Sequence, residues 1–125
     1  MKIGLTSIFV SDPIEAFHYY TKVLGFCERM FIPEANIAIV VSKDDPNGTG
    51  LLLEPNENPL AKTYQEGLYQ AGIPVITMSS DDIRAEHEKL HALGVKFTRS
   101  PAKTDWGIEA IFDDGFGNFI QLIQV

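Results

Sequence analysis

The sequence contains the same unit twice, and this duplication constrains the fold more than any other feature. In each copy an apolar, strand-like segment leads to an aspartate, an amphipathic stretch of helical period and a glycine. Aspartate is a preferred helix N-cap residue, and glycine readily adopts the left-handed conformation in which many helices end. The stretches run from Asp12 to Gly25 and from Asp82 to Gly94, so the two copies have nearly equal spacing. A repeat of this length predicts two related modules rather than a solenoid.

Further β-rich stretches complete each module after its helix. They are residues 26–32, 36–41 and 50–54 in the first copy and residues 95–97, 107–112 and 118–125 in the second. We expect modules of about residues 1–56 and 73–125, joined by a linker of about residues 57–72, within a single domain of residues 1–125. Because each helix would cover one side of a small antiparallel sheet, the pattern predicts an α+β fold.

Composition and charge exclude several classes of partner. Ten Lys and Arg against seventeen Asp and Glu give a net charge of −7, which disfavours binding to nucleic acid or to an anionic membrane. The apolar runs have the length of strands and fall well short of the roughly 20 residues that a membrane span needs. The first residues lack the pattern of a secretory signal, which predicts a cytoplasmic protein. The acidic balance favours a cationic or neutral small molecule as the partner.

Four segments of the chain form a series whose order and intervals are informative. The first contains Val10-Ser-Asp-Pro13 and Tyr19-Tyr-Thr-Lys-Val-Leu-Gly-Phe26, and the last is Phe112-Asp-Asp-Gly-Phe-Gly-Asn-Phe-Ile-Gln-Leu-Ile123. Between them lie Leu53-Glu-Pro-Asn56 and the stretch from Asp81 to Val95. Taken together, this series resembles the vicinal oxygen chelate superfamily, which includes glyoxalase I, bleomycin-resistance proteins and extradiol dioxygenases. The resemblance covers essentially the whole chain.

The resemblance implies two βαβββ modules whose sheets form a half-open β cup covered by helices, with a ligand inside the cup and commonly a second copy completing a homodimer. The function that it favours is small-molecule binding, as in bleomycin-resistance proteins, without a metal ion. The alternative is a metal-dependent enzyme, either a glyoxalase-I-type lyase similar to lactoylglutathione lyase or an extradiol-type dioxygenase. Whether the protein is catalytic stays open, and no catalytic residue is assigned.

The metal question depends on four positions that the resemblance implies. In the metal-dependent members, side chains from the first and last strands of each module hold a divalent ion, and the corresponding residues here are Leu5, Glu54, Val75 and Gln121. A zinc, nickel or iron site needs about three or four donor side chains, normally including imidazole or carboxylate. One carboxylate and one amide are too few, so we expect no metal site and no cofactor. A divalent metal is expected only under the enzyme alternative.

Alternation along the predicted strands selects the residues that would line the cup. It places Phe9 on the same side of its strand as Leu5, and the duplication places Glu54 and Gln121 at equivalent positions of the two modules. Trp106, the only tryptophan, lies in a turn from which its ring could stack on a ligand. We predict Phe9, Glu54, Trp106 and Gln121 as ligand-binding residues, with the two polar side chains fixing the orientation of the ligand.

A competing motif lies on the second predicted helix. His87-Glu-Lys-Leu-His91 matches the H-E-x-x-H signature, in which two histidines one turn apart bind zinc and the glutamate activates water. Glu109 follows at an interval where some zinc proteases place a third ligand, although that ligand normally comes from a helix and the residues around Glu109 alternate like a strand. We interpret the two histidines as solvated residues at the edge of the helix, with a zinc protease as the minor alternative.

Overall fold

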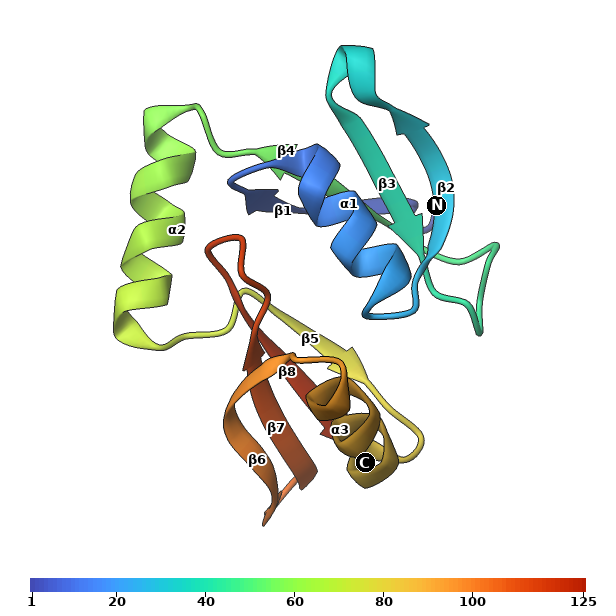
Figure 1. Cartoon of the computed structure of the whole chain (residues 1–125), viewed down its shortest axis with the longest axis vertical. Helices are drawn as coiled ribbons and strands as arrows, with labels where there is room; N and C mark the ends of the chain where they lie inside the picture. Colours follow the sequence, from blue (N-terminus) through green and yellow to red (C-terminus); the bar gives the residue numbers. More distant parts are fainter. The chain divides into compact units, whose positions relative to one another are not determined.

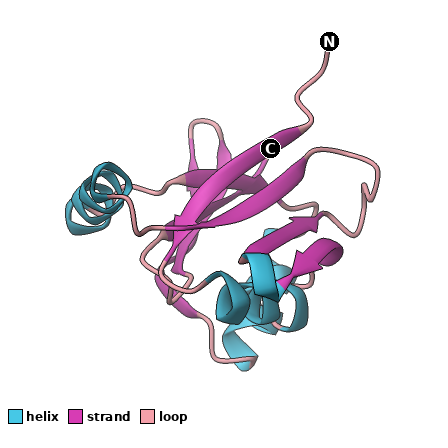
Figure 2. Ribbon diagram, turned by 90° about the horizontal axis from the view of Figure 1, so that it is seen from above, coloured by secondary structure: helices cyan, strands magenta, loops and turns pink.

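The computed structural model describes all 125 residues. The chain divides into two compact units, residues 1–62 and 63–125, and each is described by itself. The two predicted modules occupy these units, and the predicted linker contains a helix of its own, α2 (Pro59–Ala71). The first four residues precede the first strand and form the tail that ends at the label N in Figure 2. No helix of the structure combines the length and the apolar character that crossing a lipid bilayer requires.

The first module folds as strand, helix and three strands (Figure 1). Its elements are β1 (Leu5–Val10), α1 (Pro13–Lys22), β2 (Cys27–Ile32), a short 3₁₀ helix (Pro33–Ala35), β3 (Ile37–Val41) and β4 (Gly50–Pro55). The strands form one sheet in the order β1-β4-β3-β2, in which β1 is parallel to β4 and the other neighbours are antiparallel. This is the predicted βαβββ order.

The local sequence explains where α1 begins and which side it buries. The side chain of Asp12 accepts hydrogen bonds from the backbone N–H groups of Ile14 and Glu15, at 3.1 and 3.2 Å, so the predicted N-cap is confirmed. Residues of α1 that lie one turn apart point to the sheet, where they form the core with every second strand residue. The buried apolar residues are Ile8, Val10, Ala16, Phe17, Tyr20, Ala38, Val40, Val41, Leu51 and Leu53.

The second module repeats this order after α2. Its elements are β5 (Ile76–Ser79), α3 (Ile83–Ala92), β6 (Lys96–Thr104), β7 (Gly107–Asp113) and β8 (Phe119–Gln124). The sheet order is β5-β8-β7-β6, with β5 parallel to β8 and antiparallel pairing elsewhere, as in the first module. The α+β class and the two βαβββ modules are therefore confirmed, and each sheet is mixed rather than purely antiparallel. The cup between the two sheets stays a prediction.

Each sheet has one face that packs against its own helix and one that does not. Side chains alternate along a strand, so the buried residues Ala110, Phe112, Ile120 and Leu122 face α3, and their neighbours face the other way. The face opposite α3 carries Thr77, Ser79, Glu109, Ile111, Phe119, Gln121 and Ile123. By the same rule the face opposite α1 carries Leu5, Ser7, Phe9, Ile39, Leu52 and Glu54. These two faces hold three of the four residues predicted to bind a ligand.

Candidate functional site

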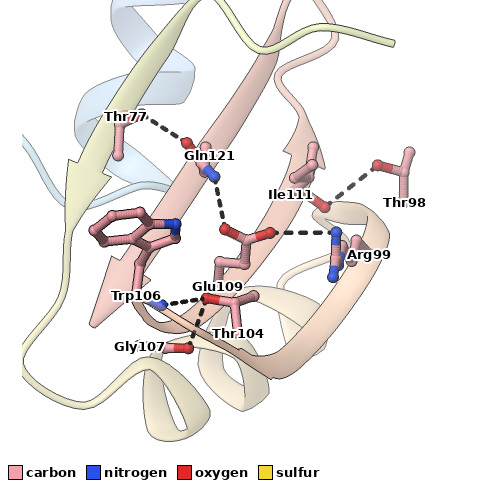
Figure 3. A network of polar contacts seen from close by, with 9 residues as sticks. All are labelled: Thr77, Thr98, Arg99, Thr104, Trp106, Gly107, Glu109, Ile111 and Gln121. Carbon is pink, nitrogen blue, oxygen red and sulfur yellow. Dashed lines mark hydrogen bonds and ion pairs between the residues drawn. The ribbon is translucent and has the colours of Figure 1, made fainter. Parts of the chain in front are cut away.

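Gln121 lies at the centre of a chain of hydrogen bonds on the face opposite α3 (Figure 3). It is directly opposite Thr77 in the parallel pairing of β5 and β8, and the Thr77 hydroxyl donates to its Oε1 at 2.7 Å. Its Nε2 donates to Oε2 of Glu109 at 3.0 Å. Glu109 pairs with Ile123, so its bond to Gln121 is a diagonal cross-strand contact. Strand register thus brings a hydroxyl, an amide and a carboxylate together.

Arg99 of β6 completes this network from the far side of β7. Its NH1 lies 3.2 Å from Oε1 of Glu109, and the side chains of Arg99 and Glu109 are 49% and 17% exposed. Each carboxylate oxygen of Glu109 therefore has its own donor, one cationic and one neutral. A partly exposed ion pair of this kind stabilises a fold by at most about 1 kcal/mol. Its larger effect is local, because it offsets the negative charge of Glu109.

Helix α2 borders one end of this face through Tyr69. The Tyr69 ring stacks on Phe119 with centroids 4.5 Å apart, and its hydroxyl donates a hydrogen bond to the carboxylate of Asp113. This hydrogen bond, together with partial burial and the nearby charges of Asp113 and Asp114, raises the pKa of Tyr69 above its ordinary value of 10.0. The phenol is consequently neutral near pH 7 and acts there as a hydrogen-bond donor.

Trp106 lies at the other end, in the tight turn that joins β6 to β7 (Figure 3). The backbone N–H of Trp106 donates to the hydroxyl of Thr104 at 3.2 Å, and that hydroxyl donates to the carbonyl of Gly107 at 3.0 Å. The Trp106 side chain is 80% exposed, which makes it one of the largest apolar surfaces that the chain presents. An exposed indole on an ordered turn is available to stack on a flat or apolar molecule.

The first module holds the other two predicted residues. Phe9 and Glu54 are partners in the parallel pairing of β1 and β4, and both are half-buried. The carboxylate of Glu54 makes no hydrogen bond or ion pair within the chain, in contrast to that of Glu109. The structure thus brings Phe9 together with Glu54 in one module, and Gln121 together with Glu109 in the other.

The pairing register corrects the predicted equivalence of Glu54 and Gln121. The helix caps Asp12 and Asp82 are equivalent, so Ser7 and Phe9 correspond to Thr77 and Ser79. The partners of these residues then correspond too, which pairs Leu52 with Gln121 and Glu54 with Ile123. Glu54 lies two residues further along its strand than predicted, on the same face. A sequence pattern of period two fixes the face of a residue but not its position along the strand.

The residues at the four family positions do not fit a divalent metal ion. After the correction these positions are Leu5, Leu52, Val75 and Gln121, of which three are hydrocarbon. The amide oxygen of Gln121 already accepts a hydrogen bond from Thr77. No group of three or more His, Cys, Asp or Glu side chains that could hold a metal ion is present in the structure. One amide does not supply the donor set that such an ion needs.

The histidines of the H-E-x-x-H motif lie on α3 without the third ligand that the sequence suggested. The ring centroids of His87 and His91 are 5.8 Å apart, and His87 packs edge-on against Phe97 at 4.5 Å. Glu109 lies on the sheet face opposite α3, where its carboxylate bonds Arg99 and Gln121. It is therefore separated from the two histidines by the sheet itself.

The role of Glu109 at this site was missed in the sequence. The sequence indicated only that the residues around Glu109 alternate like a strand, and in the structure this alternation points Glu109 away from the core. Its contact with Gln121 depends on the register of the β7–β8 hairpin, and its contact with Arg99 depends on a bulge in β6. The six-residue turn of Asp113 to Asn118 gave a signal for the hairpin, but it did not define which residues would be diagonal neighbours.

Two modules of strand, helix and three strands, each with its first strand parallel to its last, define a protein of the vicinal oxygen chelate fold. Residues 2–122 match the sequence profile of the Glyoxalase/Bleomycin resistance protein/Dioxygenase superfamily, and the chain belongs to this superfamily. The family resemblance seen in the sequence is thereby confirmed.

Three relatives illustrate the range of similarity. The "Uncharacterized protein YurT" of Bacillus subtilis (strain 168) is 44% identical over 126 residues, which cover 99% of each chain. The crystal structure of UcmS2 has a TM-score of 0.82 at 29% identity, covering 98% of this chain and 97% of that one. TnmS3, described as an antibiotic binding protein from Streptomyces sp. CB03234, has a TM-score of 0.75 at 26% identity, covering 99% and 95%.

Proposed function

We propose that this protein binds a small organic molecule without a metal ion and acts as a binding protein rather than a catalyst. The observation that carries the proposal is the face opposite α3, where the apolar side chains of Ile111, Phe119 and Ile123 lie around the hydrogen-bonded group of Thr77, Gln121 and Glu109. Small-molecule sites commonly combine an apolar lining with a few polar groups whose positions are fixed. The similarity to an antibiotic binding protein, TnmS3, supports an antibiotic-like ligand.

The residues that we propose for ligand contact are Phe9, Glu54, Trp106 and Gln121. Phe9 and Trp106 supply aromatic surface, and Gln121 supplies an oriented amide. Glu54 supplies a carboxylate that no group of the chain neutralises, which suits a cationic or donor group on the ligand. We further propose that this activity takes place in the cytoplasm, and the net charge of −7 disfavours nucleic acid as a partner.

Trp106 offers a direct test because it is the only tryptophan and is 80% exposed. We would titrate the protein with bleomycin and with a panel of other antibiotics, following the tryptophan emission and the melting temperature. A ligand that covers the indole should change the intensity or wavelength of its emission. Addition of zinc, nickel or iron(II) should leave the affinity unchanged, and turnover of a glutathione hemithioacetal by the metal-loaded protein would favour the lyase alternative over binding alone.

Replacement of the two polar residues tests the location. Glu54→Gln keeps the side-chain volume and removes the charge, so it should weaken a cationic ligand by about 1–3 kcal/mol, as expected for a charge-assisted hydrogen bond. The same change should leave thermal stability unchanged or slightly raised, because an unpaired, half-buried carboxylate costs free energy in the empty protein. Gln121→Ala should also weaken binding. Unaltered affinity in both variants would show that the ligand binds elsewhere and would contradict the proposal.

A further inference from the structure

The hydrogen bonds around Gln121 fix which way its side-chain amide points. An ionised carboxylate can only accept hydrogen bonds, so Glu109 must face the nitrogen of the amide, which it does at 3.0 Å. The amide oxygen then faces Thr77, whose hydroxyl has to donate its single proton to it, at 2.7 Å. If the amide were turned over, its oxygen would face the carboxylate of Glu109, which cannot donate, and only a bond from the amide nitrogen to the Thr77 hydroxyl could form. Glu109 therefore sets the orientation of the Gln121 amide, because its ionised carboxylate can accept hydrogen bonds but cannot donate them.

This orientation leaves donors available at the centre of the face. The amide of Gln121 has two N–H groups, of which Glu109 uses one. Arg99 has five N–H donors, and its only ion pair is the one from NH1 to Glu109. Arg99 is half exposed and Gln121 is half-buried, so a bound molecule can reach both. The proton of Thr77 is already used.

The same contacts make the centre of the face unsuitable for a cation. Glu109 is the only carboxylate of the network, both of its oxygens have donors, and its side chain is only 17% exposed. A cationic group placed beside Gln121 would find both oxygens of Glu109 already bonded to donors, and the positive charge of Arg99, which lies 3.2 Å from Glu109, would repel it. The local chemistry is thus opposite to what the net charge of −7 suggests for the molecule as a whole.

We propose that this part of the site recognises a hydrogen-bond acceptor oxygen on the ligand, either a carbonyl or a carboxylate, through the second N–H of Gln121 and the guanidinium of Arg99. The proposal rests on the proposed function and names the ligand chemistry at one of its two polar positions. Glu54, on the first module, keeps its place as the residue for a cationic or donor group.

Three matched probes test the acceptor assignment directly. They share a naphthalene ring and carry a methyl ketone, a carboxylate or an aminomethyl cation. Binding is measured by titration calorimetry, and the side-chain NH2 signals of Gln121 are followed in proton–nitrogen NMR spectra, with Gln121→Ala assigning those signals. The ketone and the carboxylate should bind about fivefold or more tighter than the cation, the factor expected for one net hydrogen bond. They should also shift the Gln121 NH2 signals, whereas the cation should not.

A pair of arginine variants serves as test and control. Arg99→Gln leaves the charge of Glu109 without its ion pair, so the preference should reverse toward the aminomethyl probe. Arg84→Gln, an exposed position on α3, makes the same change in net charge and should leave the preference intact. A wild-type protein that prefers the cation, or that binds all three probes equally without shifting the Gln121 signals, overturns the acceptor assignment. If the antibiotic titration nevertheless shows binding, that result leaves the proposed function intact. The proposed function itself is contradicted if no antibiotic binds and if Glu54→Gln and Gln121→Ala do not weaken binding.

Discussion

At the scale of single residues, Tyr69 links the charge state of a side chain to the stability of the fold. Its hydroxyl donates to Asp113, and its ring stacks on Phe119. The hydrogen bond exists only while the phenol is protonated, and the pKa of Tyr69 in the folded protein is raised above 10.0 mainly by this bond. Its contribution to stability is therefore complete below about pH 10 and is lost as the pH rises through the folded-state pKa.

Tyr69→Phe keeps the stacked ring and removes the hydrogen bond. We expect it to lower the free energy of unfolding at pH 7 by less than about 1 kcal/mol, since the phenol is partly exposed. Urea denaturation at neutral and at strongly alkaline pH should show that the wild type loses more stability between them than the variant. Tyr64→Phe, on the same helix and with a more exposed ring, is the control and should match the wild type. Equal pH dependence in Tyr69→Phe and wild type would contradict this account.

Residue faces were predicted from the sequence better than residue contacts. Alternation placed Phe9, Glu54 and Gln121 on the sheet faces that do not meet the module's own helix, as observed. It could not show that Glu54 corresponds to Ile123, because a shift of two residues along a strand preserves the face. The ion pair of Glu109 was equally hidden, since it joins strands whose register the sequence pattern does not specify.

At the scale of elements, β6 differs most from its prediction. The sequence indicated a short extended stretch at residues 95–97, whereas β6 runs from Lys96 to Thr104. This strand contains Pro101, although proline usually ends a strand. Here β6 is the edge strand of its sheet, and its register is irregular between Arg99 and Ala102, so the missing N–H of Pro101 does not interrupt the ladder. The side chain of Arg99 extends from β6 at this irregularity and forms its ion pair with Glu109.

The turn between β6 and β7 depends on Gly107, which has a φ angle of 135°. A Cβ atom at this position would overlap the carbonyl oxygen of Gln124, so the turn needs glycine both for its backbone angle and for space. Gly107→Ala should destabilise the protein by about 1–3 kcal/mol in chemical denaturation. It should also displace Trp106, which would change the tryptophan emission of the folded protein.

Gly4→Ala provides the matched control for this prediction. A Cβ atom at Gly4 would meet no heavy atom within 4 Å, and its backbone angle is not in the left-handed region. Its effect on stability should stay within about 0.5 kcal/mol of zero. A Gly107→Ala variant as stable as Gly4→Ala would show that the turn rearranges freely, against the structure.

At the scale of the whole molecule, the duplication was the feature from which the fold could be predicted. Two helix caps, Asp12 and Asp82, and two helix-ending glycines, Gly25 and Gly94, set the same element order in both halves. Residue identity then diverged between the copies, so that Leu52 in one corresponds to Gln121 in the other. The scaffold could be predicted from the sequence because it is repeated, whereas the site is specific to each copy and had to be located from the structure.

Because the two modules differ at the family's metal positions, measuring metal retention tests both modules at once. The protein purified without chelator and then offered zinc, nickel or iron(II) should retain none in stoichiometric amount after gel filtration, because three of the four family positions are hydrocarbon. Elemental analysis of the eluted protein measures this. Metal found at one equivalent would contradict the prediction. In that event His87→Ala would decide between the pair of histidines on α3 and the sheet positions, since only the former would lose its ion.

The exposed edge strand β2 bears on whether two copies of the chain associate. In the first sheet β2 is an edge strand, and it exposes 45% of Met30 and 39% of Ile32 next to unpaired backbone groups. Such an edge favours association of two copies, so we expect a homodimer of twice 13.9 kDa at micromolar concentration. Because the contact is apolar, it should persist at high salt, and Ile32→Lys should shift the protein toward the monomer. Leu60→Lys changes a more exposed residue on α2, at 81%, and should leave assembly unaltered. Sedimentation that shows only the 13.9 kDa species across the concentration range would contradict the prediction.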